Sequence, residues 1–202
     1  MNAKKQTATQ HLFTNKQLRT LLVPIMVEQL LSSLMGTADT MMVSNVGSAA
    51  ISAVSLVDAI NILVIQALSA LAAGGAILCS QYLGSQNLKK AKRSAEQVLF
   101  VMLVLSCSLS LLCLIFRFPL LRLIFGTVDT DVMANSQIYF FFTLLSFPFI
   151  GLYDAGASIL RAQNNTKGPM TISILSNFLN IGGNAILIFV FGMGVAGAAI
   201  ST

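Results

Sequence analysis

Five long runs of apolar residues restrict what this chain can fold into. Each holds roughly 18 or more mostly apolar residues, the length that a helix needs to cross the hydrocarbon core of a bilayer. A barrel strand would be about half as long and would alternate strictly between apolar and polar residues. The runs predict helices over about 18–43, 50–82, 97–116, 137–160 and 169–191, and the start of a sixth over 194–202.

The composition indicates an all-α membrane protein. Hydrophobic residues make up 55% of the 202 residues, and charged residues make up only 9%. A soluble domain is about one quarter charged. We therefore expect a polytopic helix bundle in the lipid bilayer over residues 17–202, preceded by a polar tail over residues 1–16.

The basic residues are concentrated on one side of the predicted bundle. Of the 12 Lys and Arg residues, ten fall on the side of the N-terminus and only Arg117 and Arg122 fall on the other. Because cytoplasmic loops are enriched in Lys and Arg, we expect the N-terminus and the 84–95 and 161–168 loops in the cytoplasm, with the helices in the inner (plasma) membrane. These loops account for the net charge of +5, so we expect no nucleic-acid partner.

The sequence gives no sign of an enzyme, a cofactor or a metal cluster. The lone His11 lies in the tail, and the three cysteines lie in apolar runs without C-x-x-C spacing. We find no nucleophile–base pattern in the helices. One literal match to a nucleotide-binding fingerprint, "GMGVAGA" at 192–198, lacks the strand before it and the acid after it. We expect its glycines to allow a tight turn and close packing instead.

Asp39 is a carboxylate inside the first apolar run, with no basic residue near it in the sequence. A charged carboxylate at membrane depth costs about 3 kcal/mol or more, so such residues face a bundle interior or a water-filled cavity. A carboxyl group in such a place can also take up a proton. About 20 residues, or roughly 30 Å of helix, separate Arg19 from Asp39, which places Asp39 near the outer end.

Other polar residues repeat at helical spacing. Asn180 and Asn184 share one face of the predicted fifth helix, and Asp154 lies about two turns before the inner end of the fourth. Asp58 lies near the outer end of its helix and is expected to be solvated, while Arg161 is expected to anchor its helix at the interface. Residues expected to line a substrate cavity are Glu28, Met35, Asn61, Gln66 and Asn177. An alternative is that these groups only join helices, at about 1 kcal/mol for each hydrogen bond.

Four segments, in order along the chain, resemble one known family, the multidrug and toxic compound extrusion (MATE) transporters. Pro24–Leu56, "PIMVEQLLSSLMGTADTMMVSNVGSAAISAVSL", resembles the first two helices of that family. "GGAILCSQYLGSQNLKKAKRSA" resembles the end of the second helix and the loop after it. "ILRAQNNTKGPM" resembles the turn after the fourth helix, with Asn164 where the family often has glycine. "NFLNIGGNAILIFVFGMGVAGAAIST" resembles the fifth helix and the start of the sixth.

The resemblance implies a fold of twelve helices in two lobes and the export of small organic, often cationic, compounds in exchange for protons or Na⁺. It implies that Asp39 is the coupling carboxylate of the N-terminal lobe. Its neighbours would be Asn180 and Asn184 on the fifth helix and Asp154 on the fourth, with Na⁺ held by the first three if Na⁺ is the ion. Position 184 is Asp in part of the family and Asn here, which leaves the coupling ion open.

The length suggests only part of such a transporter. The sequence stops about nine residues into the predicted sixth helix, and alternating access requires both lobes. We therefore expect most of the N-terminal lobe, with the C-terminal lobe missing, and no transport by this chain alone. Two alternatives remain open, a flippase for lipid-linked saccharides with a related helix plan and a membrane module that does not transport.

Overall fold

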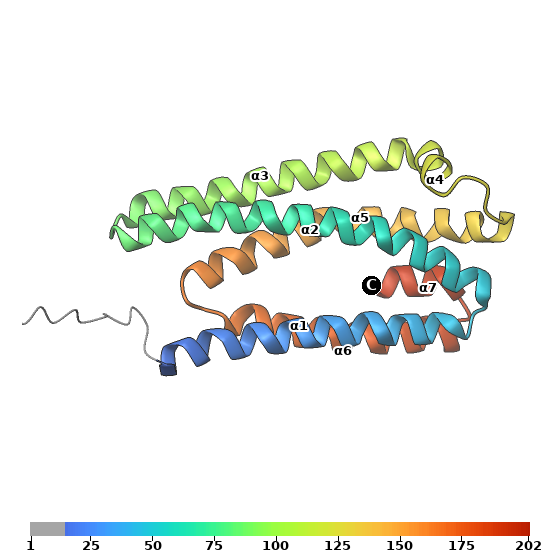
Figure 1. Ribbon diagram of the computed structural model, residues 1–202, viewed down its shortest axis with the longest axis horizontal. Coiled ribbons are helices and arrows are strands. Elements are labelled where there is room, and N and C mark those ends of the chain that lie inside the picture. Colours follow the sequence, from blue (N-terminus) through green and yellow to red (C-terminus); the bar gives the residue numbers. More distant parts are fainter. Residues whose placement is uncertain (1–14) are drawn as a thin grey trace, which may run out of the picture.

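Residues 15–202, which the computed structural model describes, form a bundle of long helices (Figure 1). The expected all-α membrane architecture is confirmed, because five helical stretches are long and apolar enough to cross a bilayer. The elements are α1 (Asn15–Ser44), α2 (Ser48–Gly84), α3 (Leu88–Ile115), α4 (Arg117–Phe125), α5 (Thr130–Ala162), α6 (Lys167–Asn184), the π-helix η1 (Ala185–Val190) and α7 (Gly194–Ser201).

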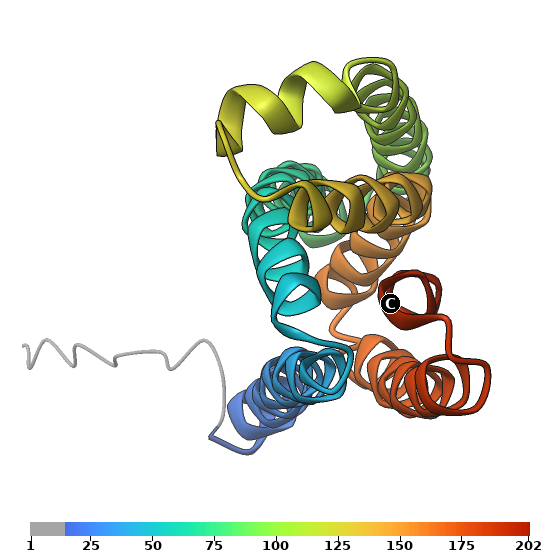
Figure 2. The ribbon, with the colours of Figure 1, turned by 90° about the vertical axis from the view of Figure 1, so that its right-hand side faces the viewer.

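The long helices pack in two groups. Helices α2, α3 and α5 form one group, α1 and α6 form the other, and α7 packs against α5 and α6 between them (Figures 1 and 2). We call the two ends of the bundle the Asn15 end and the Ser44 end, after the two ends of α1. The α2–α3 and α5–α6 turns lie at the Asn15 end, at the left of Figure 1.

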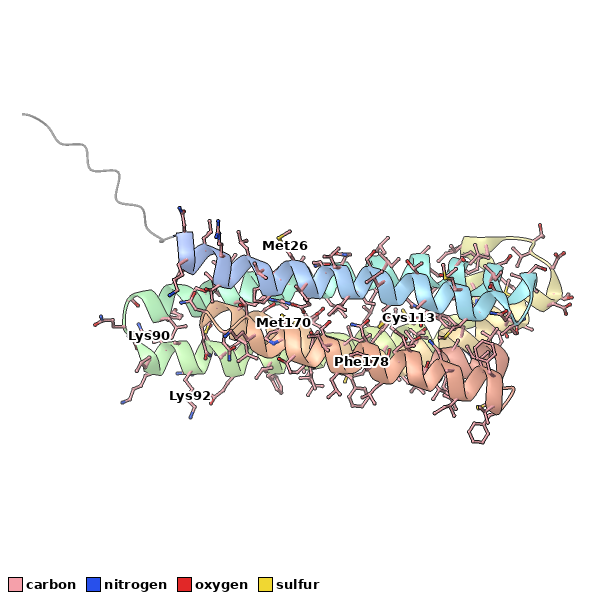
Figure 3. The ribbon with its side chains drawn as sticks, turned by 90° about the horizontal axis from the view of Figure 1, so that it is seen from below. Met26, Lys90, Lys92, Cys113, Met170 and Phe178 are labelled. Atoms are coloured by element: carbon pink, nitrogen blue, oxygen red, sulfur yellow. The ribbon has the colours of Figure 1, made fainter. Side chains whose placement is uncertain are left out.

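An apolar core joins α2 and α5 toward the Ser44 end. Phe140, Leu144 and Phe147 of α5 are almost completely buried there, together with Val57 of α2. The outer surface is also apolar. Phe178 of α6, for example, is 73% exposed and points away from the bundle (Figure 3). A surface of this kind is suited to contact with lipid chains.

Helix α3 begins earlier than expected. The third span was expected to begin at residue 97, after a basic segment with the composition of an interfacial helix. The structure joins the two in one helix, because α3 starts at Leu88, where the Asn87 side chain caps it by accepting a hydrogen bond from the Lys90 amide at 3.2 Å. The first turns carry exposed charges, including Lys90 and Lys92 (Figure 3). Apolar patterning marks only the part of a helix that crosses lipid, so it misses a polar extension.

The start of α1 also differs from the expected boundary. Asn15 and Lys16, which were assigned to the tail, are already helical. The rest of the expected tail, residues 1–14, lies outside the described residues.

The glycine-rich segment before α7 makes the tight turn that the sequence predicts. Gly192 and Gly194 have φ values of 65° and 54°, which side chains with a Cβ rarely adopt. A Cβ added at Gly197 would lie 3.1 Å from the backbone of Leu187, so the first turns of α7 pack closely on η1. The prediction of a tight turn and close packing is confirmed.

Candidate cation site

Asp39 lies near the Ser44 end of α1, on the side that faces α6. Its carboxylate is half-buried. The long apolar sequence around it forms a continuous helix, because nothing in the run between Pro24 and Ser44 interrupts it. Asp39 is therefore held at a fixed level in the bundle by the packing of α1 on α6.

Asn184 donates a hydrogen bond from Nδ2 to the Asp39 Oδ1 at 2.5 Å. The same Nδ2 lies 3.3 Å from the Asn180 Oδ1, one helical turn earlier on α6. Both asparagines are buried, Asn184 completely. The structure thus brings together Asp39, Asn180 and Asn184, which the family resemblance implies to be neighbours.

Ser201, the last residue of α7, and Thr202, which follows it, complete this group. The Ser201 hydroxyl donates to the Asn184 Oδ1. Asn180 donates from Nδ2 to the Ser201 carbonyl and to the Thr202 Oγ1, each at 3.3 Å. We call these five residues the Asp39 cluster. Ser201 and Thr202 were missed because nothing in the sequence shows that the α6–α7 turn returns them to the last turns of α6.

The Asp39 cluster has one formal negative charge and neutral partners. Among residues 15–202, the ion pairs are Lys92–Glu96 and Arg161–Glu28, so Asp39 has no basic partner there. An amide hydrogen bond stabilises a buried carboxylate but leaves its charge uncompensated. A carboxylate oxygen beside amide and hydroxyl oxygens can accept a proton or a hard cation such as Na⁺.

A second polar group lies nearer the Asn15 end. Arg161 of α5 places Nη2 at 2.7 and 2.8 Å from the two carboxylate oxygens of Glu28 on α1. The Tyr153 hydroxyl donates to Glu28 Oε1 at 3.1 Å. Arg161, expected to anchor α5 at the membrane interface, is instead the counter-charge of a buried acid. Opposite charges at membrane depth attract strongly, because little water screens them.

Asp154 belongs to this second group rather than to the Asp39 cluster. It lies within electrostatic range of Arg161 and Glu28. Its Oδ2 is buried without a hydrogen-bond partner. The structure therefore does not bring Asp154 to Asp39, although the two were expected to act together. We call Glu28, Tyr153, Asp154 and Arg161 the Glu28 cluster.

The remaining cavity candidates are dispersed. Met35 is half-buried and Gln66 is exposed. Asn177 is buried and donates from Nδ2 to the Ser173 carbonyl at 2.7 Å within α6. Asn61 is buried on α2 and donates to the Asp58 carboxylate at 3.4 Å. Of these residues, Asn61 and Asn177 keep a buried carbonyl oxygen without a partner.

A bundle of membrane-length helices with uncompensated polar groups inside it has the architecture of a multi-pass membrane protein. A family model described as MatE matches residues 24–186. The chain therefore belongs to the MatE family, and the resemblance to MATE transporters is confirmed.

Bacterial proteins described as a transporter and as a probable multidrug resistance protein are similar to this chain. An uncharacterized transporter of Bacillus subtilis, YisQ, is 34% identical over 89% of the chain, which matches 40% of that protein. A probable multidrug resistance protein, NorM, of Thermotoga maritima is 28% identical over 93% of the chain, which matches 41% of that protein. The chain thus spans about two fifths of the length of these relatives.

Solved structures agree with this relationship. An outward-facing multidrug resistance MATE family transporter superposes with a TM-score of 0.86 and 26% identity, over 93% of this chain and 41% of that one. A MOP superfamily transporter from Pyrococcus furiosus gives the same TM-score, identity and coverage. The description of the Pyrococcus structure states that reversed polarity of its binding pocket suggests a different function.

Proposed function

We propose that this chain is the N-terminal part of a secondary active exporter that exchanges organic cations for Na⁺ or protons. Asp39 would be its coupling carboxylate, and Asn180 and Asn184 would hold the ion or orient the acid. The observation that supports this most is the 2.5 Å hydrogen bond from Asn184 to Asp39. It joins α1 to α6 at an acid that has no basic partner among the described residues.

The exchange follows from competition for one negative charge. A carboxylate that holds an ion is neutralised, and its hydrogen bonds to α6 weaken when the charge is removed. An organic cation that enters the cavity would compete for the same carboxylate. Each ligand would then favour the helix arrangement that it binds better, which is the condition for alternating access.

The chemistry of the site must decide the substrate class, because one fold supports several functions. Two related proteins are described as probable multidrug resistance proteins, and one is described as an FAD transporter. A carrier of phosphate-bearing molecules or lipid-linked saccharides would need basic residues in its cavity. The Asp39 cluster has none, and Arg161 is already paired with Glu28. These features favour cationic substrates.

The orientation follows from the charge on the two ends of the bundle. The basic residues described at the Asn15 end are Lys16, Arg19, Lys89, Lys90, Lys92, Arg93, Arg161 and Lys167. Arg117 and Arg122 lie at the Ser44 end, on α4. By the positive-inside rule the Asn15 end would face the cytoplasm, and the Asp39 cluster would lie in the outer half of the cell's inner membrane.

Ethidium efflux from drug-sensitive cells tests the proposal. Cells that express the full gene product should expel ethidium, and Asp39→Asn should remove this efflux at equal membrane abundance. Asp131→Asn is a matched control, because it deletes an exposed acid in the first turn of α5. Efflux by Asp39→Asn at the rate of Asp131→Asn would refute the coupling role.

A further inference from the structure

Asp58 is a second acid in the Ser44 half of the bundle. It was expected to be solvated, but the Tyr139 hydroxyl of α5 donates to its Oδ1 at 3.1 Å, and Asn61 donates from Nδ2 to the same oxygen at 3.4 Å. Both donors are neutral. Asp58 is in neither of the ion pairs found among residues 15–202, so its charge has no basic partner in that part of the chain.

Asn61 supplies a free oxygen beside this acid. The side chain is on the same face of α2, one turn after Asp58, and is only 6% exposed. Because Nδ2 is directed at Asp58, its Oδ1 is left buried with no hydrogen-bond partner. An unpaired buried carbonyl oxygen is unfavourable, so a bound positive ion beside it would be stabilising.

A second negative charge near Asp58 makes the binding of a cation more favourable. Asp39 of α1 lies within electrostatic range of Asp58, and Tyr139 lies within range of both acids. Two carboxylates that are near each other in a medium of low dielectric constant repel. The single cation of the Asp39 cluster would neutralise only one of them.

We propose that Asp58, Asn61 and Tyr139 form a second cation position that binds Na⁺. The ligands would be an Asp58 carboxylate oxygen, the Tyr139 hydroxyl oxygen, which keeps lone pairs after it donates its hydrogen, and the Asn61 Oδ1, which a turn of the amide would bring toward Asp58 in place of Nδ2. A set made of oxygens alone suits a hard cation. A proton on Asp58 would also neutralise the acid, and the count of bound Na⁺ distinguishes a proton from Na⁺. The proposal rests on the proposed function only in treating the Ser44 half as the cation-binding half.

Counting bound ²²Na⁺ on the purified full gene product in detergent tests the second position, with choline replacing Na⁺ to keep ionic strength constant. Asp58→Asn should bind one Na⁺ fewer per molecule than the wild type. Asn61→Leu should raise the Kd of that ion about tenfold, the effect of losing about 1.4 kcal/mol. Asp131→Asn should bind as the wild type does.

Asp39→Asn separates this inference from the proposed function. The Asp58 position should still bind Na⁺ in Asp39→Asn, and the double variant Asp39→Asn/Asp58→Asn should bind one Na⁺ fewer than Asp39→Asn. If Asp39→Asn alone removes all bound Na⁺, Asp58 has no ion of its own and the inference fails while the coupling role of Asp39 stands. An unchanged Na⁺ count in Asp58→Asn, or no Na⁺ bound by the wild type, also overturns it.

Two further variants decide the question if Asp58→Asn does not fold. Asn61→Leu and Tyr139→Phe keep the Asp58 carboxylate and remove one neutral ligand each. Both should raise the Kd for Na⁺, with Asn61→Leu the larger effect, because its oxygen has no other partner. Unchanged Kd values in both variants would overturn the proposal.

Discussion

Arg161 on α5 contacts both carboxylate oxygens of Glu28 on α1, at 2.7 and 2.8 Å. Helix α1 packs mainly on α6, while α5 packs mainly on α2 and α3. One arginine therefore links the two groups of helices near the Asn15 end. The Glu28 side chain is only 11% exposed, so this carboxylate depends on Arg161 for its counter-charge.

Replacing Arg161 should destabilise the bundle. Arg161→Gln leaves Glu28 as an unpaired buried charge, which costs about 2 kcal/mol once the partial exposure of Arg161 is taken into account. We expect a lower thermal midpoint for the detergent-solubilised protein. The midpoint is measured as the temperature at which heating removes half of the monodisperse peak in size-exclusion chromatography. Arg93→Gln is the control, because Arg93 is exposed on α3.

The double variant gives a sharper test of the same pair. Glu28→Gln/Arg161→Gln removes the unpaired charge as well as the arginine, so it should be more stable than Arg161→Gln alone. A double variant that is as unstable as the sum of its two single variants would show that the pair is not coupled.

Gly183 controls the distance between α6 and α7. A Cβ added at this position would lie 2.9 Å from the Ser201 Cβ, whereas one added at Gly182 would meet nothing within 4 Å. We expect Gly183→Ala to displace α7, at a cost of about 1–3 kcal/mol, and to break the Ser201–Asn184 hydrogen bond. Ethidium efflux should fall several-fold in Gly183→Ala and stay at the wild-type rate in Gly182→Ala. Equal efflux by the two variants would argue against a role for α7 in the site.

Asn164 has a left-handed backbone conformation, with φ of 62° in the α5–α6 turn. Asn and Gly tolerate this conformation, whereas a β-branched residue does not. This explains how Asn can stand where the family often has glycine. Asn164→Gly should leave the thermal midpoint nearly unchanged, and Asn164→Val should lower stability by about 1–2 kcal/mol. Gln163→Val, at a neighbouring residue with φ of −89°, should have a smaller effect in the same thermal assay.

The membrane-spanning helices could be predicted because lipid imposes their length and apolar character on the sequence. The pairing of Asp39 with Asn180 and Asn184 could be predicted only with the family resemblance, since periodicity places residues on a face but does not say which helix that face meets. The α6–η1–α7 geometry brings Ser201 to Asn184, and no local pattern indicates it. A π-helix depends on packing around the whole segment, so no pattern in the sequence predicts η1.

The separation of the polar residues into two clusters was partly readable from the sequence. Asp154 lies seven residues before Arg161 on the same helix, so the two must be near the same end of the bundle. Glu28 lies in the matching half of α1, and an acid and a base at the same depth in a membrane are expected to pair. Asp58 was harder to place, because only tertiary packing brings the Tyr139 hydroxyl of α5 to it.

Ethidium transport by the purified full gene product in lipid vesicles tests the central claim most directly. Wild-type vesicles with an imposed Na⁺ or proton gradient should move ethidium in the direction opposite to the ion, and the gradient that drives transport identifies the ion. Asp39→Asn should lose this gradient-driven movement while it keeps its fold, as judged by its thermal midpoint. If Asp39→Asn vesicles move ethidium as fast as the wild type under the same gradient, Asp39 does not couple ion and substrate, and the account of the site is wrong.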